Sequence, residues 1–363
     1  MIKNNTTKIF SMSGISFITK IHDGNFGVIT MNGVLKFFSG KKPFNCLKTK
    51  QVTKGAALYN LKEIFFKHSK KDKIYLILYE KEILIFSIDN KYQNCFLLQK
   101  IFNDNYIGAL IQLSCSDIIF WDKKNRINLL KYVNGNKVEY NKEIVQTRII
   151  GKDIKNSYIV SFMECNDNDI ITTSTSKHPL GEDAIRIYKI ENISKLKNIM
   201  NFNGYSCAIF ENNIIKLEYQ KTICIALNYI QKNGMIIHNS SILMFDYEFM
   251  QINTILEVDL SLNSIFNFSI KSYIGNYERI YEYFMISKYK IESNSNTKKK
   301  GPDNFRYLDF YVFEPKNEYL PLLIKNIKIT TNSSIDITNS FLVNKNNLVV
   351  YQTDQVSIYF LSI

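Results

Sequence analysis

A histidine beside carboxylates is the first pattern in this chain that suggests acid–base chemistry. The segment TSKHPLGED contains His178, with Glu182 and Asp183 a few residues further on. An imidazole near a carboxylate can transfer protons at neutral pH. The same composition is also that of an ordinary solvated loop between two strands. We therefore expect a connecting loop here, without a catalytic role.

Metal ligands would appear as closely spaced cysteines, histidines or carboxylates. The chain has six widely separated cysteines: Cys46, Cys95, Cys115, Cys165, Cys207 and Cys224. No pair has the two- to four-residue spacing of a zinc site, so we expect reduced, buried thiols. The segment CNDNDI at 165–170 resembles the start of a calcium loop but lacks the later glycine and glutamate. The sequence predicts no bound metal.

Motifs of enzymes are also missing from the sequence. There is no glycine-rich phosphate loop before a helix and no Gly-x-Ser-x-Gly nucleophile elbow. The sequence therefore predicts a protein that is not an enzyme and has no cofactor and no small-molecule substrate.

Many short strands would have to position any functional side chain. Runs of five to eight residues rich in Ile, Val, Phe, Tyr and Leu alternate with polar turns, and helical periodicity is rare. Such spacing is typical of a β-sandwich, barrel or propeller. The start, MIKNNTTKIF, lacks the apolar core of a signal peptide. No apolar stretch reaches the roughly 20 residues of a membrane span. We expect a soluble protein of the cytoplasm or nucleus that is not secreted.

One strand pattern recurs along the whole chain. An aliphatic residue, any residue, an apolar residue and usually an aromatic residue end at Phe37, Phe86, Leu130, Tyr188, Phe245, Phe313 and Tyr359. The intervals between these ends run from 44 to 68 residues. Propeller blades of about 40–45 residues with inserted loops would have this spacing. Each copy follows a hairpin, such as the one at Asn32-Gly33, and an earlier strand.

A fourth strand follows most copies, for example FNCLKT, CFLLQKI and VEYNKEI. Four antiparallel strands form a propeller blade. We therefore predict one all-β domain over 1–363, a seven-bladed β-propeller with blades at roughly 13–50, 54–101, 105–146, 156–202, 205–259, 262–328 and 330–363. The surplus strand at about 7–12 would join the last blade and close the ring, which removes open sheet edges.

This pattern resembles a divergent WD-repeat protein. That family ends the third strand in Trp-Asp, and here only Phe245-Asp246 and Phe313-Glu314 approach this signature. The literal Trp121-Asp122 falls at the end of a second strand instead. The family's turn aspartate before the third strand is matched by Asp122, Asp183 and Asp354. Its glycine–histidine element is absent, so hydrophobic packing between sheets should hold the blades.

The resemblance implies a non-catalytic scaffold that binds other proteins as a subunit of a larger complex. Propellers that bind phosphoinositides carry a paired arginine, which the segment NFNGYSCAIF lacks, so a membrane partner is not expected.

The net charge of +13 leaves an alternative open. A basic loop face would hold the RNA backbone of a ribonucleoprotein or a ribosome-assembly particle. Its candidate residues are Lys123, Lys124, Arg126, Lys152, Lys155, Lys177, Lys298, Lys299 and Lys300. Only five of the 46 basic residues are arginine, the usual bidentate phosphate ligand. The lysine excess also fits the amino-acid bias of an AT-rich genome.

Overall fold

The structure is a computed structural model built from β-strands. It describes residues 6–11, 14–41, 44–54, 59–66, 73–122, 126–132, 145–152, 157–166, 169–176, 184–192, 195–207, 213–233, 235–258, 261–274, 277–292, 303–313, 321–331, 337–344, 347–352 and 355–360. Every regular element in these ranges is a strand. They contain no helix of the length and apolarity that a membrane crossing requires. The predicted all-β class is confirmed.

The strands pair into small antiparallel sheets in chain order. The first sheets are β2 (Ile15–Lys20), β3 (Phe26–Thr30), β4 (Val34–Phe38) and β5 (Cys46–Gln51); β6 (Asn60–Ile64), β7 (Lys73–Tyr79), β8 (Glu82–Asp89) and β9 (Cys95–Phe102); β10 (Ile107–Gln112), β11 (Ile118–Asp122), β12 (Arg126–Tyr132) and β13 (Val145–Lys152); and β14 (Ser157–Asn166), β15 (Asp169–Ser176), β16 (Ala184–Asn192) and β17 (Lys195–Asn203).

The later sheets continue the pattern. They are β18 (Tyr205–Cys207), β19 (Ile214–Leu217), β20 (Thr222–Lys232), β21 (Met235–Asp246) and β22 (Gln251–Glu257); β23 (Ser261–Ile274), β24 (Tyr277–Glu292), β25 (Asp303–Phe313) and β26 (Pro321–Thr331); and β27 (Ile337–Asn344), β28 (Asn347–Gln352) and β29 (Gln355–Phe360) with β1 (Thr6–Ser11). Each sheet is named below by its first and last strand. The predicted four-stranded antiparallel sheets are confirmed.

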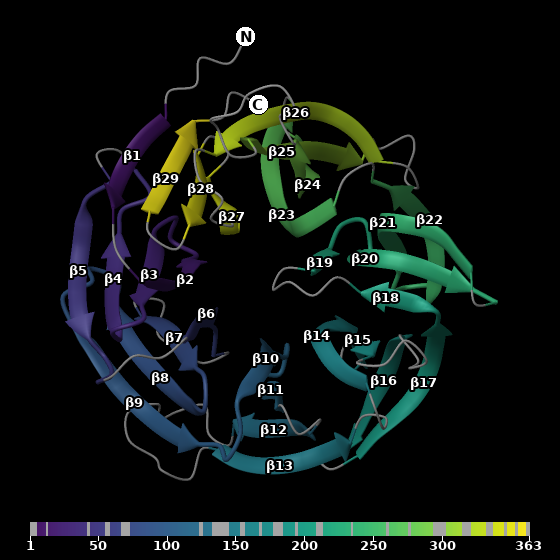
Figure 1. Ribbon diagram of the computed structural model, residues 1–363. Coiled ribbons are helices and arrows are strands. Elements are labelled where there is room, and N and C mark those ends of the chain that lie inside the picture. The colour runs from purple at the N-terminus through teal and green to yellow at the C-terminus, as the bar shows by residue number, and fades with distance from the viewer. Residues whose placement is uncertain are drawn as a thin grey trace.

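The sheets are arranged around a common centre, and the first strand of each lies innermost (Figure 1). Innermost strands of neighbouring sheets contact one another, as β10 does with β14 and β2 does with β27. β1 pairs antiparallel with β29, from Thr6 opposite Tyr359 to Ser11 opposite Gln355. Strands from the two ends of the described chain thus share one sheet.

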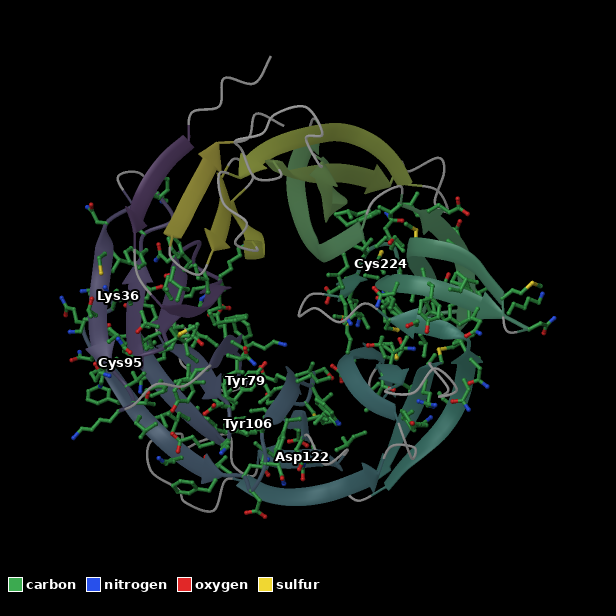
Figure 2. All side chains as sticks on the ribbon, viewed as in Figure 1. Lys36, Tyr79, Cys95, Tyr106, Asp122 and Cys224 are labelled. Atoms are coloured by element: carbon green, nitrogen blue, oxygen red, sulfur yellow. The ribbon has the colours of Figure 1, made fainter. Side chains whose placement is uncertain are left out.

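Side chains fill the spaces between neighbouring sheets (Figure 2). The second strands β3 and β11 are buried along their whole length, because a sheet packs against each of their faces. Their nearly unbroken apolar runs follow from this two-sided burial. Apolar clusters join successive sheets through pairs such as Phe37 with Phe86, Ile77 with Phe120, Trp121 with Ile170, Ile187 with Phe245, and Met244 with Phe284.

The repeat positions of the third strands mostly lie in these clusters. Phe37, Phe86, Leu130 and Phe245 are at most 2% exposed. Tyr188 in β16 is half-buried, and Phe313 and Tyr359 lie on β25 and β29. Of the predicted turn aspartates, Asp183 and Asp354 lie outside the described residues.

Three local predictions are wrong. The strand beside β12 is Val145–Lys152 rather than 138–144, because the register from Arg126 to Tyr132 uses these later residues. Asp122 is the last residue of β11, fully buried, and not a turn residue. The innermost strand of the β18–β22 sheet, predicted as 214–220, consists of two short strands, β18 and β19, that both pair with β20.

Candidate partner-binding site

The turns that follow the first strands share one backbone shape in two of the sheets. After β2, the amide of Gly24 donates to the carbonyl of Ile21 at 3.0 Å; after β10, Ser116 donates to Leu113 at 2.9 Å. Gly24 has φ +86° and Ser116 φ +76°. Glycine accommodates this left-handed conformation without strain, whereas serine adopts it at a cost. The innermost strands thus end in a repeated, compact turn.

Glu63 of β6 holds the turn of the neighbouring β2–β5 sheet. Its carboxylate accepts the backbone amide of His22 at 2.8 Å and lies 2.5 Å from His22 Nδ1. The Glu63 side chain is only 8% exposed. Burial raises the pKa of Glu63, and the hydrogen bonds from His22 oppose that rise. The contact joins two sheets by their polar groups.

The same contact recurs at the next two junctions between sheets. Gln112 of β10 accepts the amide of Phe65 at 2.6 Å and donates to the Phe65 carbonyl. Glu164 of β14 accepts the amide of Ser114 at 2.7 Å and its hydroxyl at 3.0 Å. Within one sheet, one residue accepts a hydrogen bond from the preceding sheet, and the residue two positions later donates its amide to the following sheet. Glu63 and Phe65 are such a pair. A period-two strand places the two residues on the same face.

A lysine makes the fourth junction. The Lys216 ammonium of β19 donates to the carbonyl of Cys165 at 2.8 Å and lies 4.7 Å from the centre of the Tyr247 ring. Asn166 donates to the Tyr247 carbonyl at 2.9 Å. Polar contacts therefore link five successive sheets at one end of their innermost strands. The sequence predicts hydrophobic packing alone between sheets, and these contacts add to it.

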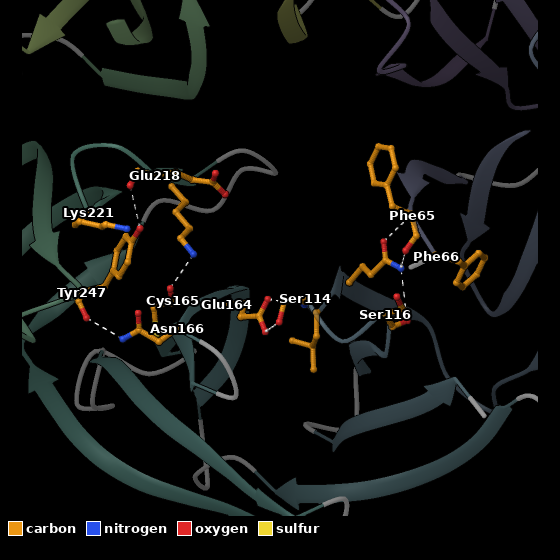
Figure 3. Close-up of a pocket in the computed structure, with 13 residues that line it drawn as sticks. Phe65, Phe66, Ser114, Ser116, Glu164, Cys165, Asn166, Glu218, Lys221 and Tyr247 are labelled. Atoms are coloured by element: carbon orange, nitrogen blue, oxygen red, sulfur yellow. Dashed lines mark hydrogen bonds between the residues drawn. The ribbon is translucent and has the colours of Figure 1, made fainter. Parts of the chain in front are cut away.

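A cavity of about 850 Å³ opens where these turns meet (Figure 3). It is lined by Phe65, Phe66, Gln112, Leu113, Ser114, Ser116, Glu164, Cys165, Asn166, Lys216, Glu218, Lys221 and Tyr247. Four sheets contribute to it. Aromatic side chains at this end are open to solvent, among them Phe65, 55% exposed, and Tyr219, 58% exposed, in the turn between β19 and β20.

The chemistry of the cavity is that of recognition. Carboxylates, lysines, an amide and aromatic rings surround it, which is the mixture found in binding sites. Burial raises the pKa of the Cys165 thiol to about 11, and the thiol donates to the Asp169 carbonyl at 3.3 Å. The thiol therefore stays protonated at neutral pH, because only a lowered pKa gives a nucleophilic thiolate. Within the described ranges, no three His, Cys, Asp or Glu side chains gather as metal ligands.

No protein-family model matches the chain, and no curated protein matches it. Solved structures do. The C-terminal WD40 domain of Sif2 aligns over 100% of both chains at a TM-score of 0.54 and 11% identity. The structure of U3-55K aligns over 98% of both chains at 0.54 and 10%. Raptor of Chaetomium thermophilum aligns over 99% of this chain and 29% of its own, at 0.57 and 10%.

The fold is that of a WD40 domain. At identities near these values the likeness concerns the architecture alone. In a WD40 fold, the turns at one end of the innermost strands form one face around the central opening. The turns described above lie on that face.

Of the basic residues singled out from the sequence, Arg126 and Lys152 lie on described strands. Arg126 begins β12 and Lys152 ends β13, and the two are paired in register. They lie at the opposite end of their sheet from Gln112, since Asp122 pairs with Ile107 there and Gln112 with Ile118 at the cavity end. The structure therefore places Arg126 and Lys152 on strands, whereas the sequence predicts loops. Lys123, Lys124, Lys155, Lys177, Lys298, Lys299, Lys300 and His178 lie outside the described residues.

Sequence reasoning missed the cavity residues. A signal for them exists: a polar residue lies at the end, or within two residues of the end, of three successive innermost strands, at Glu63, Gln112 and Glu164. The hydrogen-bond partner of each of these three residues depends on which turns lie next to one another in the fold.

Proposed function

We propose that this chain is a non-catalytic scaffold that binds a protein partner over the cavity at the central end of the innermost strands. The observation that carries the proposal is a cavity of about 850 Å³ whose surroundings leave Phe65 and Tyr219 more than half exposed. Exposed aromatic rings beside a concave polar site are typical of protein-binding surfaces, where they become buried anchors.

The stiffness of the face supports this proposal. Hydrogen bonds from Glu63, Gln112 and Glu164 fix the turns relative to the neighbouring sheets. A surface that is rigid before binding loses less conformational entropy when it binds. We further infer that the sheets are the seven blades of a ring closed by the β1–β29 pair, with the blade limits predicted from the sequence.

The polar side chains of the cavity already make hydrogen bonds within the protein, and this also favours a binding role over catalysis. Glu164 holds Ser114, Gln112 holds Phe65, and the Lys216 ammonium donates to a carbonyl. Groups committed to the backbone in this way fix geometry, whereas a nucleophile would need an activating base.

The test is quantitative affinity purification of the tagged full chain from its source cells, with chemical cross-linking. We expect a stoichiometric protein partner cross-linked near the cavity. Phe65→Ser and Tyr219→Ser should each reduce its recovery about tenfold, the loss expected for an exposed aromatic anchor. The matched control is Met235→Ser, a 68% exposed side chain at the start of β21, at the other end of its sheet.

Two outcomes would contradict the proposal. One is recovery of the partner unchanged by both cavity variants. The other is an RNA partner, lost on ribonuclease treatment and on adding salt, in place of a protein. RNA binding through the predicted basic loops would depend steeply on salt, because phosphate contacts release counterions.

A further inference from the structure

The outer strands of the first two sheets expose an unusual amount of apolar surface. β5 and β9 lie at the outside of the ring, where Figure 2 labels Cys95 at the start of β9. On β9, Phe96 is 60% exposed, Leu97 49% and Phe102 77%. On β5, Leu47 is 40% exposed. Contiguous apolar exposure of this kind marks a binding surface more often than scattered single residues do.

The outer strand β22 provides a comparison within the same chain. Its apolar side chains, Ile252, Ile255 and Leu256, are all partly buried, and only its terminal Gln251 and Glu257 are exposed. An outer position in the ring therefore does not by itself expose large apolar side chains. The apolar exposure on β9 therefore exceeds that on β22.

β9 also has a free backbone edge. Among the described strands it pairs with β8 alone, as the last strand of its sheet. Natural edge strands are protected by lysines, prolines or bulges. β9 has one bulge, opposite Ile85 and Phe86, no proline, and a single lysine. That lysine, Lys100, is held by Glu82 at 2.6 Å and lies over the Phe102 ring.

The register of β9 places apolar side chains on both of its faces. Leu97 stands opposite Phe86, whose ring packs toward the β2–β5 sheet, and Phe96 stands opposite Ser87 on the other face. An added strand would therefore meet apolar side chains above and below its plane, because side chains alternate across a sheet.

The charged residues within β5 and β9 themselves are all basic, and one of them, Lys100, is paired with Glu82 of β8. β5 and β9 together carry Lys48, Lys50 and Lys100 and no carboxylate. Lys48 donates to the Gln93 carbonyl at 2.8 Å and Lys50 to the Cys95 carbonyl, so both ammonium groups lie against the start of β9. The complementary partner is therefore acidic.

We propose that the free edge of β9 binds an extended segment of a partner protein in which apolar residues alternate with carboxylates. The segment would add a strand beside β9 through main-chain hydrogen bonds, as in known strand-addition complexes. Its apolar side chains would cover Phe96, Leu97 and Phe102, and its carboxylates would lie near the lysines. This surface is separate from the central cavity and does not depend on the function proposed for it.

The test is hydrogen exchange of the full chain, followed by mass spectrometry, with synthetic peptides as long as β9. The probe alternates valine with glutamate, and the reference peptide alternates valine with lysine. We expect the glutamate probe to slow exchange over 95–102 and the lysine peptide to leave it unchanged. Absence of protection at saturating probe, or equal protection by both peptides, would overturn the proposal.

Variants locate the site independently. Phe96→Ser and Phe102→Ser should each weaken binding of the glutamate probe about tenfold, measured by fluorescence anisotropy. Phe249→Ser removes an equally exposed ring, 72% against 77% for Phe102, and should leave the affinity unchanged. Equal losses in all three variants would contradict the assignment to β9. Phe65→Ser should bind the probe normally, so failure of the central site and failure of the β9 edge are told apart.

Discussion

The Glu63 carboxylate accepts the backbone amide of His22 at 2.8 Å from across the junction between two sheets. The same relation joins Gln112 to Phe65 and Glu164 to Ser114. Each acceptor and the next donor are two residues apart. The end of one strand therefore accepts a hydrogen bond from the preceding sheet and donates one to the following sheet. The turns around the cavity are therefore fixed as a series.

The Glu63 contact predicts a dependence of stability on pH. Burial raises the pKa of Glu63 above the ordinary value of a glutamate carboxyl, so the folded chain binds the proton more tightly than the unfolded chain. The free energy of unfolding should then fall as pH rises from the ordinary carboxyl value through the raised one, and be level above it. Glu63→Gln should flatten this part of the curve, measured by urea unfolding at a series of pH values. The exposed Glu248→Gln should keep the wild-type slope; an unchanged slope in Glu63→Gln would contradict the prediction.

Glu164→Ala removes the acceptor of both hydrogen bonds from Ser114. We expect a loss of about 0.5–1.5 kcal/mol in the free energy of unfolding, since two hydrogen bonds to an exposed turn are lost. The denaturation midpoint in urea, at constant m-value, is the measurement. Glu248→Ala, at an exposed glutamate in the turn after β21, should change stability by less than about 0.5 kcal/mol. Equal effects of the two substitutions would show that the junction contributes nothing.

Gly108 lies against the only tryptophan. A Cβ at this position would stand 1.6 Å from Trp121 Cζ3, and the indole is 7% exposed. Gly108→Ala should destabilise the chain by about 1–3 kcal/mol, because the ring has to move within a packed junction. Adding Trp121→Leu should recover part of that loss, and a double-mutant cycle measures the coupling. Additive effects of the two substitutions would contradict the clash.

Gly24 and Ser116 occupy the same position in two similar turns, both with positive φ. Nothing lies within 4 Å of a Cβ built on Gly24, so only backbone strain opposes a side chain there. Gly24→Ser should cost about 1–2 kcal/mol. Ser116→Gly should be neutral or gain up to about 1 kcal/mol, because relief of strain exceeds the entropy of a glycine. Thermal unfolding of the two single variants measures both effects. A stabilising effect of Gly24→Ser would contradict the predicted backbone strain.

The six cysteines should react in two groups. Cys46 and Cys115 are exposed, whereas Cys95, Cys165, Cys207 and Cys224 are buried. The burial predicted for all six is thus wrong for the first two. An alkylating reagent should modify Cys46 and Cys115 in the folded chain, and the other four only after unfolding, as followed by peptide mass spectrometry. Rapid labelling of Cys165 would contradict its burial and raised pKa.

Local patterns in the sequence suffice for most strands. The turn predicted at Asn32-Gly33 does join β3 to β4, but as a three-residue loop, Met31 to Gly33, with Gly33 at φ +72°, and not as a two-residue hairpin. The apolar run IYLILY becomes the buried strand β7. Such features depend on neighbouring residues and on burial from both sides. They therefore follow from the order of residue types.

Pairing and site geometry depend on residues that are distant in sequence. Both VEYNKEI and VQTRIIGK suit a strand, and only the register with β12 selects the second. Glu164 and Ser114 stand 50 positions apart, so no local pattern links them. Asp246, which approaches the family signature, accepts the amides of Glu248 and Phe249 and thereby caps its own turn. Its role could be identified only from those contacts.

The pairing of β1 with β29 has a consequence for the making of the protein. Residues 6–11 leave the ribosome long before residues 355–360 have been translated. At about 5–20 residues per second, β1 waits roughly 20–70 s for its partner strand. During that time the edge of β1 is exposed to other chains. Synthesis speed and chaperone occupancy should therefore govern the yield of native protein more strongly than the stability of any single sheet.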